Sequence, residues 1–177
     1  YLSIRGFPQR RISVLINGVP LNDPESHEVY WIDHPDLLAS TGELTVQRGA
    51  GAALYGAAAV GGSVNIVTSP FTSEPEQRVT VGYGSFETKR VSFETNSGDL
   101  AGGWNAYGRY SRVESLGYRE QSWSRLWSYT VAARRVLGRQ SVQANLYGGP
   151  EETHLAYYGL SPEALAIDRR FNPLTYP

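Results

Sequence analysis

Residues 22–36 contain side chains of the types that catalyse reactions or bind metal ions and other ligands. Its sequence, NDPESHEVYWIDHPD, has neither a strand nor a helix period, so we expect a loop. His27, Glu28, Asp33 and His34 offer the imidazole and carboxylate groups that bind divalent metals. The His-Glu pair is not followed by the second His of an HExxH motif, and the spacing matches no zinc signature. We therefore favour a solvated or ligand-contacting loop and expect no metal centre.

Motifs for catalysis or cofactor binding are weak in the rest of the chain. Gly49 to Ala53 follows a predicted strand and imitates the G-x-G-x-x-G turn of dinucleotide-binding domains. The last position of that motif is Leu54, and no acidic residue stands about 20 positions further on to hold a ribose. No G-x-S-x-G nucleophile elbow and no pair of catalytic carboxylates stands out. We expect no cofactor and no enzymatic activity.

Composition narrows the class of protein further. The 177 residues carry a formal net charge of -1, which gives no argument for nucleic-acid binding. The chain has no Cys, which excludes disulfides, thiolate zinc sites and iron–sulfur clusters from these residues. No apolar run approaches the length of a transmembrane helix. The chain also lacks Met and begins within a strand-like segment, so we interpret it as a fragment with sequence missing on both sides.

The first part of the chain is organised around the segment from Leu44 to Ser69. It reads as a strand, a glycine- and alanine-rich turn with a short helix of small residues, and a second strand. Residues 11–16 predict another strand, and Asn17-Gly18 predicts a type I′ turn after it. Residues 35–40 predict one or two helical turns that begin at their proline.

After residue 77 the sequence becomes a series of alternating strands. Apolar and polar side chains alternate over the segments 78–83, 90–96, 104–112, 125–135 and 141–147. A soluble sandwich would turn the apolar face toward a core, whereas a membrane barrel would turn it toward lipid. Trp and Tyr near strand ends, together with short connections that alternate with long ones, favour the barrel. From Gly148 onward we expect a long irregular segment.

Four motifs in this order resemble the plug domain of TonB-dependent outer-membrane receptors. They are Ser3-Ile4-Arg5-Gly6-Phe7, the RISVLING run over Arg11 to Gly18, Val46-Gln47-Arg48-Gly49, and Tyr55-Gly56-x-x-Ala59-x-Gly61-Gly62-Ser63-Val64-Asn65-Ile66. The last motif is long and specific. Residues 77–150 resemble the opening strands of the family's barrel more weakly, by position and alternation. The resemblance implies an α+β plug domain followed by antiparallel transmembrane β-barrel strands, as a fragment of a plugged barrel of about 22 strands.

The resemblance also implies how the chain is divided. Residues 1–70 would be a plug domain that is incomplete at its N-terminus, and residues 71–77 a linker at the periplasmic rim. Residues 78–177 would be the N-terminal part of the barrel, with about five strands and an extracellular loop at the end. The connections 97–103 and 137–140 would be periplasmic turns, because short turns lie on that side of such barrels.

Plug loops of the family face the external mouth of the barrel, and the resemblance places two such loops in this chain. The residues expected to contact a ligand are Phe7, Gln9, Arg10, His27, Glu28, Tyr30 and Trp31. An alternative for the last two is that they only pack the plug. Arg5 and Arg48 match plug positions where arginines pair with barrel carboxylates, so the resemblance implies that they lock the plug in place.

The implied function is energy-coupled uptake of a scarce ligand through the outer membrane of a Gram-negative bacterium. The ligand classes are ferric siderophore, haem, cobalamin and glycan. The implied partners are that small-molecule or metal-chelate ligand, outer-membrane lipid, and the TonB complex of the inner membrane, through a TonB box that these residues do not contain. Two alternatives stay open: a passive outer-membrane porin or adhesin barrel, and a soluble β-rich binding domain.

Overall fold

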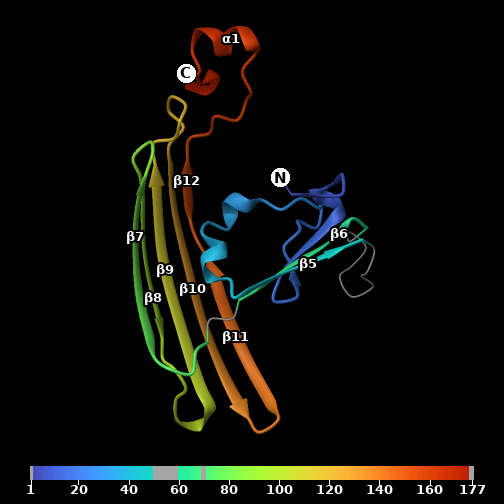
Figure 1. Ribbon diagram of the computed structural model, residues 1–177, viewed down its shortest axis with the longest axis vertical. Coiled ribbons are helices and arrows are strands. Elements are labelled where there is room, and N and C mark those ends of the chain that lie inside the picture. Colours follow the sequence, from blue (N-terminus) through green and yellow to red (C-terminus); the bar gives the residue numbers. More distant parts are fainter. Residues whose placement is uncertain (1, 50–59, 69–70, 176–177) are drawn as a thin grey trace. The chain divides into compact units, whose positions relative to one another are not determined.

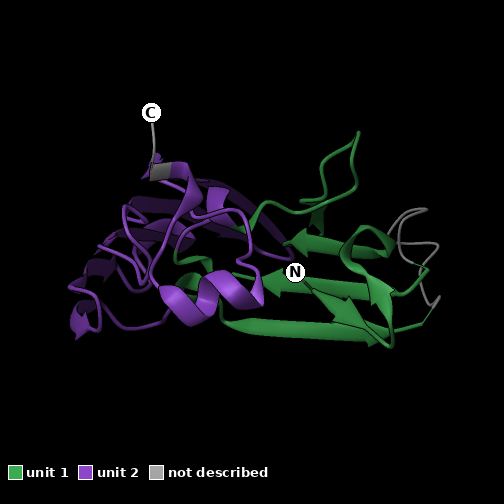
Figure 2. Ribbon diagram, turned by 90° about the horizontal axis from the view of Figure 1, so that it is seen from above, with its two compact units in different colours: residues 1–31, 36–70 green, residues 32–35, 71–177 purple. Residues whose placement is uncertain are grey.

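The structure is a computed structural model that describes residues 2–49, 60–68 and 71–175. It divides into two compact units, each with a β-sheet of its own (Figures 1 and 2). Unit 1 comprises residues 1–31 and 36–70, and unit 2 comprises residues 32–35 and 71–177. Among the described residues no helix is long and apolar enough to span a membrane.

A four-stranded mixed sheet forms the centre of unit 1 (Figure 1). Its strands, in order across the sheet, are β4 (Val19–Pro20), β3 (Ile12–Ile16), β6 (Gly62–Val67) and β5 (Glu43–Arg48). β3 and β6 are parallel, whereas β4 and β5 run antiparallel to their neighbours. These strands confirm the ones predicted around residues 11–16 and at both ends of the 44–69 segment. The helix predicted between β5 and β6 falls on residues 50–59, which lie outside the described residues.

The core of unit 1 is built from aliphatic side chains at alternate positions of β3 and β6. Its buried members are Ile4, Ile12, Val14, Ile16, Val29, Val64 and Ile66. β3 is buried along its whole length, as the central strand of a sheet requires. The edge strand β5 is exposed along its whole length, and its apolar residues Leu44 and Val46 are 52% and 49% exposed. Its register is fixed by pairing with β6 alone among the described strands.

Two tight turns shape the ends of unit 1. Asn17 and Gly18 have φ values of 51° and 82°, which confirms the predicted type I′ turn between β3 and β4. Arg5 and Gly6 have the same pair of φ values, so the chain forms a hairpin from β1 (Ser3–Ile4) to β2 (Phe7–Pro8). The first of the two expected plug loops, which carries Phe7, Gln9 and Arg10, is therefore partly a strand, followed by a 3-10 turn at Gln9–Arg11.

The predicted helical turns after Pro35 are present but start later. A 3-10 turn covers Leu37–Ser40, and Asp36 precedes it in the left-handed region with a φ of 59°. A left-handed residue cannot belong to the turn, so Pro35 is not its first helical residue. A further 3-10 turn covers Trp31–Asp33.

Unit 2 is an antiparallel meander (Figure 1). Its strands are β7 (Glu76–Gly84), β8 (Thr88–Asn96), β9 (Trp104–Ser115), β10 (Ser124–Leu137) and β11 (Gln140–Gly148), which lie side by side in chain order. They confirm all the predicted strands and extend each of them by one to three residues at one or both ends. The cross-strand registers keep apolar residues opposite one another, as in the row Val79, Phe93, Tyr110 and Tyr129.

A soluble β-sandwich buries the apolar face of each sheet and exposes the polar face. In this sheet the apolar face is exposed instead, and many side chains of the polar face are buried. Large apolar side chains are open to the surroundings, with Val79 and Val81 66% and 73% exposed. Side chains buried on the opposite face are mostly polar, among them Ser92, Asn105 and Arg109. A face this apolar and this exposed is not stable in water over so large an area. The sheet therefore has the polarity of a wall whose apolar side faces lipid.

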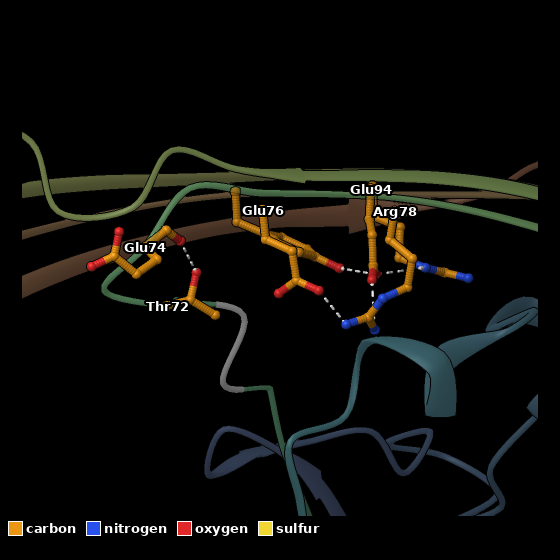
Figure 3. Close-up of polar contacts among 7 residues, drawn as sticks. Thr72, Glu74, Glu76, Arg78 and Glu94 are labelled. Carbon is orange, nitrogen blue, oxygen red and sulfur yellow. Dashed lines mark hydrogen bonds and ion pairs between the residues drawn. The ribbon is translucent and has the colours of Figure 1, made fainter.

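The polar face of unit 2 carries a cluster of charges near the start of β7. Arg78 points at Glu76 and at Glu94 of β8, with 2.9 Å between its Nη1 and Glu94 Oε1 (Figure 3). The other carboxylate oxygen of Glu94 accepts a hydrogen bond from the Tyr107 hydroxyl at 3.2 Å. Because Glu94 is shared by two strands beside its own, the cluster ties β7, β8 and β9 together at one level.

The segment after β11 is more regular than the sequence predicts. It contains β12 (Glu151–Thr153), which pairs with β10, and the helix α1 (Pro162–Ile167), capped by the Ser161 hydroxyl. Arg119, in the loop between β9 and β10, donates hydrogen bonds to the carbonyl oxygens of Phe171, Ala156 and Tyr158. The prediction of a long irregular segment is therefore wrong, because contacts between loops that are distant in sequence organise this segment.

Candidate ligand-binding site

Two loops of unit 1 meet at the buried side chain of Gln9, which is 2% exposed. Its Nε2 donates hydrogen bonds to Glu28 Oε2 and to the Val29 carbonyl oxygen, both at 2.9 Å. Its Oε1 accepts from Trp31 Nε1 at 2.6 Å and from the Leu2 amide at 3.3 Å. One amide thus satisfies partners from the N-terminal hairpin and from the loop over residues 21–31.

The loop over residues 21–31 is shaped by its own short polar side chains. Asn22 Oδ1 accepts a hydrogen bond from the Val14 amide at 2.8 Å, and its Nδ2 donates to the carbonyl oxygens of Ile12 and His27. Asp23 accepts hydrogen bonds from the amides of Glu25 and Ser26 and from the Ser26 hydroxyl. The hydrogen bonds from Ser26, first its amide and then its hydroxyl, lower the pKa of the Asp23 carboxyl. The loop is thus anchored to β3 and closed by an ionised Asp.

The seven predicted ligand contacts differ in their exposure. Six of them are exposed or half-buried and so are available to a ligand: Phe7, Arg10, His27, Glu28, Tyr30 and Trp31. Gln9 does not fit the prediction, because its amide is buried and all its hydrogen-bonding capacity is used inside the protein. Its place is beneath the surface, where it holds Glu28 and Trp31.

Trp31 and Tyr30 each have a polar partner for their side chain. The indole N–H of Trp31 is bound to Gln9, while the residue as a whole is 37% exposed. The Tyr30 hydroxyl lies 3.5 Å from the Ser26 hydroxyl, and more than half of the side chain is exposed. Two anchored aromatic rings with open faces suit stacking against a ligand at low cost in conformational entropy.

His27 lies at the tip of the loop with a φ of 59°, and its side chain is exposed. Its amide donates to the Asp23 carbonyl oxygen at 2.9 Å, so the backbone fixes where the imidazole emerges. Within the described part of the chain no three His, Cys, Asp or Glu side chains form a group that suits a metal ion. His34 belongs to the other unit.

Glycines of the 44–69 segment support the first loop directly. A Cβ added to Gly61 would lie 2.6 Å from Phe7 Cβ, and the Gly61 amide donates to the Arg11 carbonyl oxygen at 2.8 Å. A Cβ added to Gly62 would lie 2.5 Å from the Gln47 carbonyl oxygen, in the partner strand β5. Both glycines therefore let neighbouring residues approach closely, and at Gly61 the neighbour is Phe7 of the first loop.

The two arginines predicted to lock the plug lie at ends of elements. Arg5 is in the β1–β2 turn, and Arg48 is the last residue of β5. Both are exposed, and neither forms an ion pair with a described residue of unit 1. Their pairing with barrel carboxylates stays a prediction.

Comparisons with known proteins agree with this geometry. Residues 1–63 match the family model described as the TonB-dependent Receptor Plug Domain. The Vitamin B12 transporter BtuB of Photobacterium profundum is 34% identical over 100 residues, which are 56% of this chain and 15% of that protein. The Probable TonB-dependent siderophore receptor PirA of Acinetobacter baumannii is 29% identical over 131 residues, which are 64% of this chain and 17% of that protein. The matched regions thus cover less than a fifth of these relatives.

A solved structure extends the likeness beyond the plug. The ferric citrate transporter FecA in the unliganded form has a TM-score of 0.70 at 21% identity, over 93% of this chain and 26% of that chain. At this identity the likeness concerns the fold, and its coverage includes the meander of unit 2. The family match identifies residues 1–63 as a TonB-dependent receptor plug domain, and the strands that follow share their fold with the solved FecA chain.

Proposed function

We propose that the receptor containing this chain takes up a small-molecule or metal-chelate ligand with energy from the TonB complex. The observation that carries the proposal is that Gln9 joins two loops of the domain that matches the plug family. These loops present aromatic, imidazole and guanidinium groups. The relatives supply the ligand classes to test, since one is a vitamin B12 transporter and another a probable siderophore receptor. Haem and glycans are further classes within the proposal.

The proposed mechanism involves no covalent chemistry. Ligand would bind to Trp31, Tyr30 and His27, with Arg10 and Phe7 on the neighbouring loop. Energy-driven transport requires that the plug bind the ligand more tightly in one conformation than in another. A ligand shifts a conformational equilibrium only through such a difference in affinity. TonB would favour the weaker-binding conformation and so release the ligand inward. A passive porin or adhesin barrel has no need of a plug, which disfavours that alternative.

The proposed division of the chain is close to that of the two units, except that residues 32–35 belong to unit 2 and that β7 already begins at Glu76. We assign residues 1–70 to the plug, 71–77 to the linker and 78–177 to the barrel wall. The plug match over residues 1–63 and the separate sheets support this division. The extracellular connections would then be residues 84–89, residues 114–122 and the segment from residue 148.

Substitution of Trp31 or His27 by Ala tests the proposed contact surface. We expect each to weaken binding about 10- to 100-fold, the cost of truncating an aromatic or polar anchor of roughly 1.4–2.8 kcal/mol. The probes are vitamin B12, ferric citrate and a ferric pyoverdine, titrated against the full-length receptor in detergent. Barrel assembly, read from heat-modifiable migration on a gel, should not change.

Leu38→Ala is the matched control, because Leu38 is an exposed side chain of unit 1 that lies outside both loops. It should bind like the unsubstituted receptor. If both loop variants keep full affinity for the probe that the receptor binds, the ligand surface lies elsewhere.

A further inference from the structure

Residues 71–75, which precede β7 and are called the strap below, are fixed to the sheet that follows them. The strap contains neither helix nor strand. Its partners lie in three other segments of unit 2, which are the 97–103 connection, β9 and β10. They lie near the end of the sheet that carries the 97–103 connection (Figure 1). All of these residues belong to one compact unit, so the contacts describe how unit 2 holds its own first residues.

Backbone contacts continue the pairing of β7 and β8 into the strap. The Asp99 amide donates a hydrogen bond to the Ser73 carbonyl oxygen at 2.9 Å, which keeps the register of the β7–β8 pairs. Next to this bond Pro75 packs on Gly98, where an added Cβ would lie 2.6 Å from the Pro75 nitrogen. The strap therefore lies along the 97–103 connection before the regular strand begins.

The buried side chain of Asn105, in β9, holds the preceding residue of the strap. Asn105 is 1% exposed, and its Nδ2 donates hydrogen bonds to the Thr72 carbonyl oxygen at 2.7 Å and to Asp99 Oδ1 at 3.1 Å. The Thr72 hydroxyl donates to the Glu74 carbonyl oxygen at 2.6 Å, which stabilises the bend of the strap (Figure 3). One amide group thus joins the strap to β9 and to the 97–103 connection.

Phe71, the first residue of the strap, lies against a cation of β10. The Arg134 guanidinium is 4.7 Å from the centre of the Phe71 ring, within the range of a cation–π contact. Arg134 is also the direct cross-strand partner of Asn105, so both side chains lie on the polar face of the sheet. Residues 73, 72 and 71 thus contact, in that order, the connection after β8, then β9, then β10.

This arrangement determines where a pull on the chain before residue 71 would act. A pull applied directly to Glu76 would open the β7–β8 ladder one residue pair at a time from its end. Through the strap, the same pull meets contacts with three elements before it reaches β7. Proteins open locally in cooperative units, and the free energy of opening rises with the contacts that break together. The strap therefore protects the first strand of unit 2 from a pull.

We propose that the strap stays fixed to the polar face of unit 2 while the plug changes conformation, and that Asn105 is the residue that positions the strap. The proposal rests on the proposed function, since it takes TonB as the source of the pull and unit 1 as the part that moves. It adds that the wall is anchored against this pull at the 97–103 connection. The pull then acts on unit 1 and does not peel β7 from β8.

A disulfide between the strap and the 97–103 connection tests whether the strap must detach. Ser73→Cys and Asp99→Cys are combined in the full-length receptor without other cysteines, because both side chains are exposed and a backbone hydrogen bond joins the two residues. Cells that express this variant are oxidised or reduced, and TonB-dependent uptake of vitamin B12, or of the iron from ferric citrate or ferric pyoverdine, is measured. We expect the disulfide to form and the rate of uptake to be the same in both states.

Asn105→Asp tests the positioning role, because it keeps the size of the side chain and replaces the Nδ2 donor by an acceptor. We expect the Asp99 amide to exchange with deuterium about 10-fold faster, the effect of losing one hydrogen bond that holds the strap. Uptake should fall several-fold while the affinity for the bound probe stays unchanged. The disulfide between positions 73 and 99, added to this variant, should restore uptake, which it would not do for a defect elsewhere in the wall.

Asn145→Asp is the matched control. Asn145 of β11 is an exposed asparagine on the same face, and its Oδ1 accepts a hydrogen bond from Gln143 Nε2. The control should match the unsubstituted receptor in exchange, affinity and uptake.

Three results would overturn the proposal and leave the proposed function intact. One is uptake that stops on oxidation and returns on reduction, which would show that the strap must detach. Another is that the thiols at positions 73 and 99 each react with a maleimide but never couple to each other. The third is an Asp99 amide that exchanges in the Asn105→Asp variant as it does in the control. An unsubstituted receptor without TonB-dependent uptake would instead remove the proposed function, and this proposal with it.

Discussion

Replacement of Gln9 by Leu is expected to weaken ligand binding about 10- to 100-fold without preventing barrel assembly. Leu fills a similar volume but leaves the Val29 carbonyl oxygen, the Glu28 carboxylate and the Trp31 indole without their shared partner. An unsatisfied buried polar group costs about 1–3 kcal/mol, and the Val29 contact is buried. The loop would lose its fixed position, and the ligand groups it presents would no longer be held ready. Titration of the bound probe against the full-length variant measures the effect.

The Gln9→Glu variant tests whether the hydrogen bonds of Gln9 position the loop, because it nearly preserves the size of the side chain and so its packing. The introduced carboxyl would be buried beside Glu28 and the Val29 carbonyl oxygen, and both burial and the neighbouring negative charge raise its pKa in the folded state. A group with a raised folded-state pKa contributes stability below its ordinary pKa, about 4.3 for Glu, and loses that contribution as pH rises through the raised value. Protonated, it can still donate to one oxygen and accept from the indole.

The affinity of the Gln9→Glu variant should therefore approach that of the unsubstituted receptor in mild acid and fall toward neutral pH. The unsubstituted receptor, measured at the same pH values, supplies the control for direct effects of pH on the probe. An affinity ratio between the two proteins that does not change with pH would contradict the positioning role of the amide. So would a Gln9→Leu variant with undiminished affinity.

Replacement of Gly62 by Ala is expected to destabilise the plug sheet by about 2–4 kcal/mol. The added Cβ would lie 2.5 Å from the Gln47 carbonyl oxygen, which is backbone of the paired strand and has little room to move. The φ of 144° at this residue is also one that L side chains rarely adopt. Strands β5 and β6 would separate at this end, close to the Gly61 contact with Phe7.

Limited proteolysis of the full-length receptor along a denaturant gradient measures the effect, with cleavage sites mapped to residues 43–67. Gly18→Ala is the matched control, because Gly18 has a φ of 82° but nothing within 4 Å of the added Cβ. It isolates the cost of the left-handed backbone, about 1–2 kcal/mol. Equal cleavage midpoints in the two variants would show that close packing at Gly62 contributes nothing.

The strands were predictable because they follow from local alternation. The period of two along β7 to β11 depends on neighbouring residues only, and the observed registers preserve it, as in the pairing of Phe93 with Tyr110. The Asn17-Gly18 turn is equally local, since its residues tolerate positive φ. The exposure of Leu44 and Val46 was not predictable, because alternation indicates which side chains share a face and not what covers that face.

The candidate site was only partly predictable, for the same physical reason. The 22–36 stretch stands out by composition, but nothing local to Gln9 indicates burial. Its Glu28, Val29 and Trp31 partners are 19 to 22 residues away along the chain. The helix α1 was missed because its six residues carry too little periodicity, although Ser161 followed by a proline is a start signal.

Uptake by whole cells tests most directly whether this plug belongs to an energy-coupled receptor. The full-length protein is expressed in Gram-negative cells that lack their own receptor for the bound probe, with and without a functional TonB complex. Accumulation of radiolabelled vitamin B12, or of the iron from the ferric citrate or ferric pyoverdine that binds, is measured over time. We predict accumulation that requires both the receptor and TonB and that falls with Trp31→Ala. Equal accumulation with and without TonB would contradict the account and indicate a passive pore.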